Sequence, residues 1–70
     1  MITLENINNN LAEAIKKSGL TQVEIAERVG VRQQQISCYM RSQKTPGLDT
    51  FARICKALDL DPADILCLND

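Results

Sequence analysis

The stretch TQVEIAERVGVRQQQISCYMR, residues 21–41, predicts two short helices joined by a tight turn. Thr21 and Glu24 form a T-x-x-E capping box, in which each side chain accepts a hydrogen bond from a backbone N–H that the first helical turn leaves unpaired. Gly30 ends the first helix, because glycine adopts a left-handed backbone conformation at little cost. A second helix begins at about Arg32, and the rest of the chain is expected to support this pair.

Both helices have one apolar and one polar side. The apolar positions recur at helical spacing and are Ile25, Ala26, Val29, Ile36, Tyr39 and Met40. The outward side of the second helix offers amides, a hydroxyl, a thiol and a guanidinium, from Gln33, Gln34, Ser37, Cys38 and Arg41. No acid lies along it. These groups suit a surface of hydrogen-bonding edges and negative charge, such as base pairs between phosphates.

The charges are segregated along the chain, although the net charge is only −1. Residues 28–48 contain four basic side chains and no acid, and residues 57–70 contain four acids and no base. Attraction to DNA depends on the field within about a Debye length, roughly 10 Å at 0.1 M salt. The basic segment therefore outweighs the total charge in predicting a nucleic-acid partner.

The sequence resembles the helix-turn-helix domains of the lambda-repressor and Cro-like (XRE-type) family. The matching positions are Gln22, Ala26, Gly30, Val31, Ile36 and Tyr39. The resemblance extends from about Leu4 to Leu66. It implies an all-α, compact five-helix bundle, with helices 2 and 3 as the helix-turn-helix and residues 1–70 as a single DNA-binding domain. The chain departs from the family pattern at Arg32, where the family prefers Ser or Thr, and at residues 40–42, where it often has Glu-Asn-Gly.

Three further helices are predicted around the central pair. A stripe of Leu4, Ile7, Leu11 and Ile15 indicates a first helix that starts after Thr3. Because the asparagine run at residues 8–10 is a weak helix former, the amino-terminal turn and a half is expected to fray. The fourth helix carries Leu48, Phe51, Ile54, Cys55 and Leu58, with Phe51 expected at the centre of the core. Asp61 and Pro62 start a fifth helix, as cap and first helical residue. Its Ile65, Leu66 and Leu68 either close the core or form a dimer contact.

The composition argues against other functions. No histidine is present, so an imidazole base, a Ser-His-Asp triad and a histidine metal ligand are excluded, and we expect no enzyme, metal or cofactor. No apolar stretch approaches the roughly 20 residues of a membrane helix, which predicts a cytoplasmic protein. Cys55 and Cys67 are expected to be buried free thiols. Cys38 is interpreted as an exposed contact residue, with redox sensing as the alternative.

The side-chain chemistry and the resemblance together predict a sequence-specific regulator of transcription, most simply a repressor. It would bind a palindromic site in double-stranded DNA as a homodimer, with residues 32–41 in the major groove and no small-molecule ligand. The expected base contacts are Gln33, Gln34, Ser37 and Cys38. The expected phosphate contacts are Thr21, Gln22, Arg32, Arg41 and Lys44. The alternative for Gln33 to Gln35 is a solvated polar helix start, and the alternative for Lys44 and Thr45 is a solvated basic loop.

A second hypothesis uses the same fold differently. The acidic and apolar end of the chain, residues 58–70, would bind another protein, as in an antitoxin that neutralises a partner. Binding through apolar contacts changes little with salt, whereas phosphate contacts weaken steeply as salt rises. Salt dependence therefore separates the two hypotheses.

Overall fold

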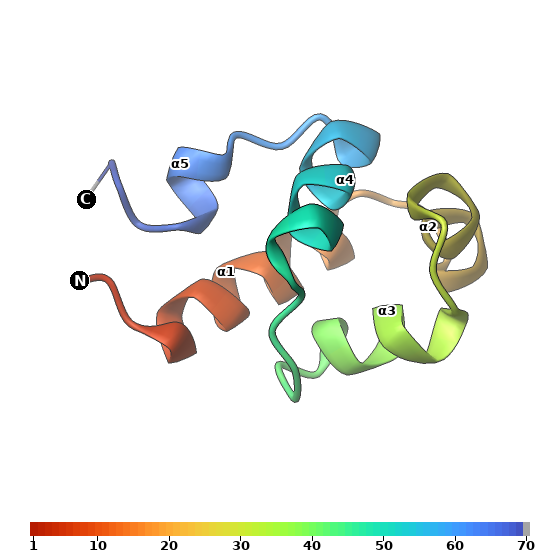
Figure 1. Ribbon diagram of the computed structural model, residues 1–70, viewed down its shortest axis with the longest axis horizontal. Coiled ribbons are helices and arrows are strands. Elements are labelled where there is room, and N and C mark those ends of the chain that lie inside the picture. The colour runs from red at the N-terminus through yellow and green to blue at the C-terminus, as the bar shows by residue number, and fades with distance from the viewer. Residues whose placement is uncertain (70) are drawn as a thin grey trace.

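The computed structural model describes residues 1–69, and helices account for all of the regular structure in that range. The helices are α1 (Leu4–Lys17), α2 (Gln22–Val29), α3 (Gln33–Met40), α4 (Leu48–Leu58) and α5 (Pro62–Ile65) (Figure 1). The predicted all-α architecture, with a helix-turn-helix formed by α2 and α3, is confirmed. Within residues 1–69, no helix has the length and apolar character needed to cross a membrane.

The predicted helix starts are present as hydrogen bonds. Thr3 Oγ1 accepts from the Asn6 N–H at 3.1 Å and starts α1. At α2, Thr21 Oγ1 accepts from the Glu24 N–H at 3.1 Å, and Glu24 Oε1 accepts from the Thr21 N–H at 3.3 Å. Asp61 Oδ1 accepts from the Ala63 N–H at 2.9 Å, with Pro62 as the first residue of α5. Each cap pairs N–H groups that a helix end otherwise exposes.

The core forms where α2 packs on α3 and α4, and where α1 packs on α3 and α5. Aliphatic side chains fill it, and the large ones that are fully buried are Leu11, Ile15, Ile25, Ile36 and Ile54. Ala26, 6% exposed, lies in the same cluster. A small residue there lets α2 approach its neighbours closely, and α3 is thereby held on a rigid support.

The expectation that Phe51 forms the centre of the core is wrong. Phe51 is half-buried and packs against the edge of the cluster, while Ile54, one turn later, is fully buried. Two other members of the predicted apolar stripes are also on the surface, since Leu48 is 89% exposed and Leu4 is 61% exposed. These residues lie in the first turns of α4 and α1, which extend past the helices that would cover them.

The α1 helix is continuous through its asparagine run, contrary to the expected fraying. The reason is tertiary: the side chains of Asn8, Asn9 and Asn10 each hydrogen-bond another part of the chain. Asparagine in a helix costs roughly a few tenths of a kcal/mol relative to a good helix former, and these hydrogen bonds outweigh that cost.

The α3 helix ends at a serine in the left-handed conformation. Ser42 has φ +58°, its N–H donates to the Tyr39 carbonyl at 3.1 Å, and the Gln43 N–H donates to the Cys38 carbonyl at 2.9 Å. This is the hydrogen-bond pattern of a Schellman motif, in which glycine usually occupies the left-handed position. Ser42 therefore ends α3 in the conformation for which the family often uses glycine.

Two of the three cysteines are buried, as predicted. Cys55 and Cys67 are each 6% exposed, and Cys38 is half-buried on α3. Burial raises the pKa of the Cys55 thiol, and the nearby carboxylate of Asp61 raises it further. The Cys55 thiol therefore stays protonated at neutral pH and behaves as a small apolar group.

Candidate nucleic-acid interface

The start of α3 carries three exposed glutamines, of which Gln35 caps the helix. Arg32 has an extended backbone and its side chain makes no capping hydrogen bond. Gln35 supplies half of a cap instead, because its Oε1 accepts from the Arg32 N–H at 3.1 Å. Gln33 and Gln34 remain exposed in the first turn. The amide oxygen of Gln35 thus holds the helix start, while the amides of its two neighbours face outward.

A shallow hollow beside α3 gathers several of the predicted contact residues. It encloses about 390 Å³ and is lined by Arg32, Gln34, Gln35, Cys38 and Lys44. Lys44 reaches this hollow from the loop after α3. Two cations therefore flank two amides and a thiol, with no acid in the lining. Of these residues, Gln35 was not predicted to lie at the site, and its place follows from its i+3 spacing to Arg32.

Two predicted contact residues hydrogen-bond each other. Arg41 Nη2 donates to Ser37 Oγ at 2.8 Å, and Arg41 Nε donates to the Ser37 carbonyl at 3.4 Å. The guanidinium of Arg41 is exposed, and Ser37 is half-buried. Arg41 therefore lies along the outer side of α3 near its end, where a positive charge also complements the helix dipole.

The start of α2 holds the remaining predicted phosphate contacts. The Thr21 hydroxyl is already occupied, because Thr21 Oγ1 both accepts from the Glu24 N–H and donates to Glu24 Oε1, each at 3.1 Å. Gln22 follows it as the first helical residue and is half-buried. The donors left for a phosphate at this end are the first backbone N–H groups of α2 and the Gln22 amide.

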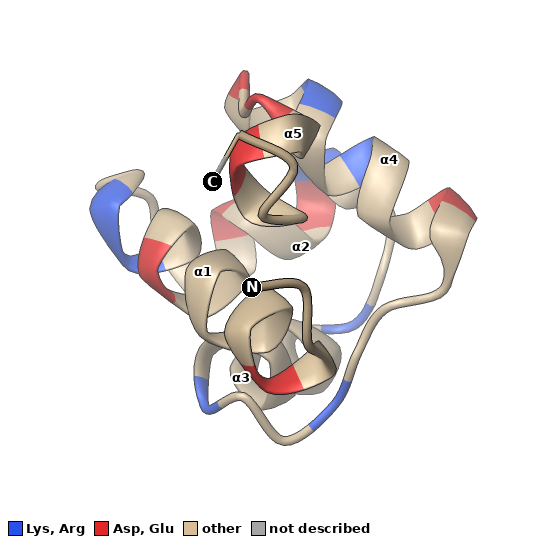
Figure 2. Cartoon of the chain, turned by 90° about the vertical axis from the view of Figure 1, so that its left-hand side faces the viewer, with Lys and Arg blue, Asp and Glu red and all other residues tan. Residues whose placement is uncertain are grey.

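The acidic segments gather at one end of the molecule. Figure 2 shows Lys and Arg segments on the loops that flank α3, and red acidic segments around α5 at the opposite end of that view, where α4 also carries Lys or Arg segments. Beneath α3, Tyr39 is 5% exposed. Burial raises its pKa, with smaller contributions from Cys38 and Asp49, so the phenol carries no charge near the site at neutral pH. The face around α3 is therefore cationic, and a second group of cations, Arg28, Arg53 and Lys56, lies beside α2 and α4.

A helix-turn-helix whose second helix exposes amides between cations is the arrangement of a DNA-binding domain. The chain belongs to the helix-turn-helix family of the XRE type, whose family model matches residues 11–65. This is a family of DNA-binding regulators and not of enzymes.

Individual relatives agree with this assignment. The chain is 44% identical over 60 residues to an uncharacterised HTH-type transcriptional regulator of Methanothermobacter thermautotrophicus, covering 86% of this chain and 87% of that protein. It is 43% identical over 44 residues to the antitoxin HigA1 of Mycobacterium tuberculosis, a match that spans 63% of this chain but only 30% of that protein.

The fold has a solved counterpart. The restriction-modification controller protein C.AhdI of Aeromonas hydrophila superposes with a TM-score of 0.74, covering 89% of this chain and 94% of that one. The two sequences are 24% identical, so the likeness concerns the fold. It supports the predicted lambda-repressor-like arrangement of helices.

Proposed function

We propose that this chain is a transcriptional repressor that binds a palindromic operator as a homodimer and places α3 in the major groove. The observation that carries the proposal is the exposed first turn of α3, where Gln33 and Gln34 lie beside the cationic hollow. A glutamine amide donates to and accepts from adenine N7 and N6, and one such pair is worth roughly 1–3 kcal/mol of discrimination. Cys38 and Ser37, further along α3, contact bases or a thymine methyl at shorter range.

The phosphate contacts come from both sides of α3. Arg32 precedes the helix, and Lys44 reaches the same hollow from the following loop. Arg41 supplies a third cation at the end of α3. The start of α2, which Thr21 caps, supplies neutral donors from its first backbone N–H groups and from the Gln22 amide. These contacts orient the domain on the duplex without reading its sequence.

A homodimer is proposed because one such domain reads few base pairs. Ile2 and Leu68 are each 60% exposed and Leu4 is 61% exposed. The segment before α1 and the described segment after α5 lie at the same end of the molecule in both views (Figures 1 and 2). These three residues offer apolar area for a second copy, related by a two-fold axis. The two α3 helices would then contact half-sites one helical turn, roughly 34 Å, apart.

The test is selection of bound duplexes from a randomised DNA pool, followed by sequencing. Enrichment of an inverted repeat with half-sites one turn apart supports the operator and the dimer together. Placing that repeat across a promoter should lower transcription in vitro, whereas an increase would replace the repressor with an activator. A correctly folded chain that enriches no sequence would contradict sequence-specific binding.

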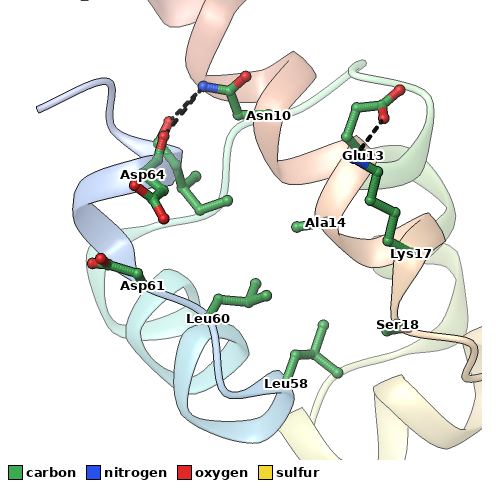
Figure 3. Close-up of a pocket in the computed structure, with 10 residues that line it drawn as sticks. Asn10, Glu13, Ala14, Lys17, Ser18, Leu58, Leu60, Asp61 and Asp64 are labelled. Carbon is green, nitrogen blue, oxygen red and sulfur yellow. Dashed lines mark hydrogen bonds and ion pairs between the residues drawn. The ribbon is translucent and has the colours of Figure 1, made fainter. Parts of the chain in front are cut away.

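A second candidate function is protein binding at the opposite end, as an antitoxin-like module. A groove of about 540 Å³ lies between α1 and the segment from the end of α4 to α5. Figure 3 shows Leu58 and Leu60 extending from that segment toward α1, with Asp61 and Asp64 further along it. Glu13 and Lys17 on α1 form the other rim and pair at 3.8 Å. The apolar floor and acidic rim suit a partner segment with apolar and basic side chains.

Paired variants distinguish the two functions. Glu13→Lys reverses a charge on the groove rim, where the side chain is exposed, and Gln34→Ala alters only the α3 face. A repressor keeps its operator affinity in Glu13→Lys and loses base preference in Gln34→Ala. The protein-binding function is favoured if Glu13→Lys abolishes the biological effect while Gln34→Ala leaves it intact.

A further inference from the structure

The loop from Arg41 to Gly47, which joins α3 to α4, is tied to α1 by two asparagines. Thr45 Oγ1 donates to Asn8 Oδ1 at 2.8 Å, and Ser42 Oγ donates to Asn9 Oδ1 at 3.1 Å. These bonds join residues that are 37 and 33 positions apart in the sequence. Ser42 Oγ also donates to the Asn8 backbone carbonyl at 3.5 Å, a longer bond that does not need an asparagine side chain.

The two tied residues, Ser42 and Thr45, lie on either side of Lys44 in the loop. Ser42 precedes Lys44 by two positions and Thr45 follows it directly, so the backbone at Lys44 is restrained from both sides. Pro46 restricts the chain further on, because its ring fixes φ. Lys44 itself is exposed and lines the hollow beside α3. The restraint therefore acts on the backbone of Lys44, while the flexible Lys44 side chain can still reach outward.

The third asparagine points the other way. Asn10 Nδ2 donates to the Ile65 carbonyl at 3.2 Å and to the Asp64 carbonyl at 3.4 Å, so it ties α1 to α5. Successive helix positions are turned by about 100°, which sends neighbouring side chains to different partners. Asn10 is thus a matched internal control, with the same residue type on the same helix but a different partner.

We propose that Asn8 and Asn9 are positioning residues for DNA binding, which hold the α3–α4 loop so that Lys44 meets a phosphate without the loop having to become ordered. This inference rests on the proposed function. Ordering a mobile loop on binding lowers affinity, and a loop that is already held avoids that loss. The asparagines are expected to touch the loop and not the bases.

The test is a double-mutant cycle on the duplex enriched from the randomised pool. One arm is Asn8→Ala with Asn9→Ala, the other is Lys44→Ala, and dissociation constants are measured for all four combinations. We expect the asparagine pair to weaken binding roughly fivefold when Lys44 is present and less than twofold when it is absent. Alanine is the better helix former, so α1 should stay folded, and circular dichroism at the assay temperature checks this.

Control variants separate positioning from stability. Asn10→Ala should have the same effect with and without Lys44, because it does not touch the loop. Thr45→Ser, which keeps the hydroxyl donor, should bind like the parent chain, whereas Thr45→Val should resemble Asn8→Ala. Equal losses from the asparagine pair in both Lys44 backgrounds, or no loss at all, would overturn the inference while leaving the repressor intact. A parent chain that binds no duplex would instead overturn the proposed function.

Discussion

Arg41 donates from its guanidinium to the Ser37 hydroxyl at 2.8 Å, so that the cation at the end of α3 is held along that helix. A guanidinium held in this way loses less side-chain freedom when it meets a phosphate. The same bond occupies one lone pair of Ser37 and leaves its hydroxyl proton available to a base or a phosphate. The hydrogen bond therefore joins the residue proposed to contact a phosphate, Arg41, to the residue proposed to contact a base, Ser37.

Arg41→Ala should weaken DNA binding to all sequences alike. Loss of one phosphate contact makes the negative slope of log K against log salt shallower by about 0.9, and titrations at several salt concentrations measure this change. Arg53→Ala is the matched control, because Arg53 lies with Arg28 and Lys56 beside α2 and α4, away from the α3 hollow. A slope that changes equally in both variants would show that only total charge matters.

Gln34→Ala should alter which DNA sequence is preferred. Loss of one amide contact is expected to cost roughly 1–3 kcal/mol at a single base pair of each half-site and to leave the other positions unchanged. Binding to a panel of single-base operator variants measures this. Gln34 is exposed, so the free energy of unfolding should stay within about 0.5 kcal/mol of the parent value. Uniform weakening across the panel would instead assign Gln34 to the phosphate backbone.

Asp59→Gly should stabilise the fold. Asp59 ends α4 in the left-handed conformation, with φ +54°, and its carboxylate lies at the negative end of the helix dipole. Glycine removes both penalties, and the expected gain is about 1 kcal/mol. For a domain of this size such a gain raises the melting temperature by roughly 4–8 °C.

Asp59→Asn separates the two causes, since asparagine tolerates the left-handed conformation and carries no charge. Asp59→Asn should therefore raise the free energy of unfolding by only the electrostatic part of the gain expected for Asp59→Gly. If Asp59→Gly melts at or below the parent temperature, the α4 end is held by contacts of the carboxylate that outweigh the backbone penalty.

Stability should fall in alkaline solution partly through Cys55. Burial raises the pKa of this thiol above its ordinary value of 9.0, so the folded chain keeps the proton to higher pH than the unfolded chain does. The contribution to stability is complete below about pH 9 and is lost as pH rises through the folded-state pKa. Urea titrations between pH 8 and pH 10 measure the slope of the free energy of unfolding against pH.

The control for this slope is Cys55→Ala, which removes the titrating group. Its unfolding free energy should be lower at neutral pH, because a buried side chain is shortened, but should decline less as pH rises. The pKa of Tyr39 is also raised, from 10.0, so its part of the decline falls at higher pH and is common to both chains. Parallel declines in the two chains would rule out Cys55 as a source.

Much of the fold was predictable because its signals are local. The Thr21–Glu24 box, the left-handed Gly30 and the Asp61–Pro62 start each act within about four residues, and the structure has all of them. The second helix could be identified in the same way, from apolar spacing on one side and polar groups on the other. Short-range hydrogen bonds and steric limits determine such features, and they do not depend on the partners that pack later.

The sequence by itself thus determined where helices begin and end and which family the chain joins. Only the tertiary structure decided that Ile54 rather than Phe51 is buried, since exposure depends on which turns of α4 another helix covers. It also decided that Asn8 meets Thr45 and that Lys44 joins Gln34 and Cys38 around one hollow. Asn8 and Thr45 are 37 positions apart, and only the packing of the loop on α1 brings them within hydrogen-bonding distance. Lys44 is close to α3 in the sequence, but the direction that the loop takes after the helix decides where it lies.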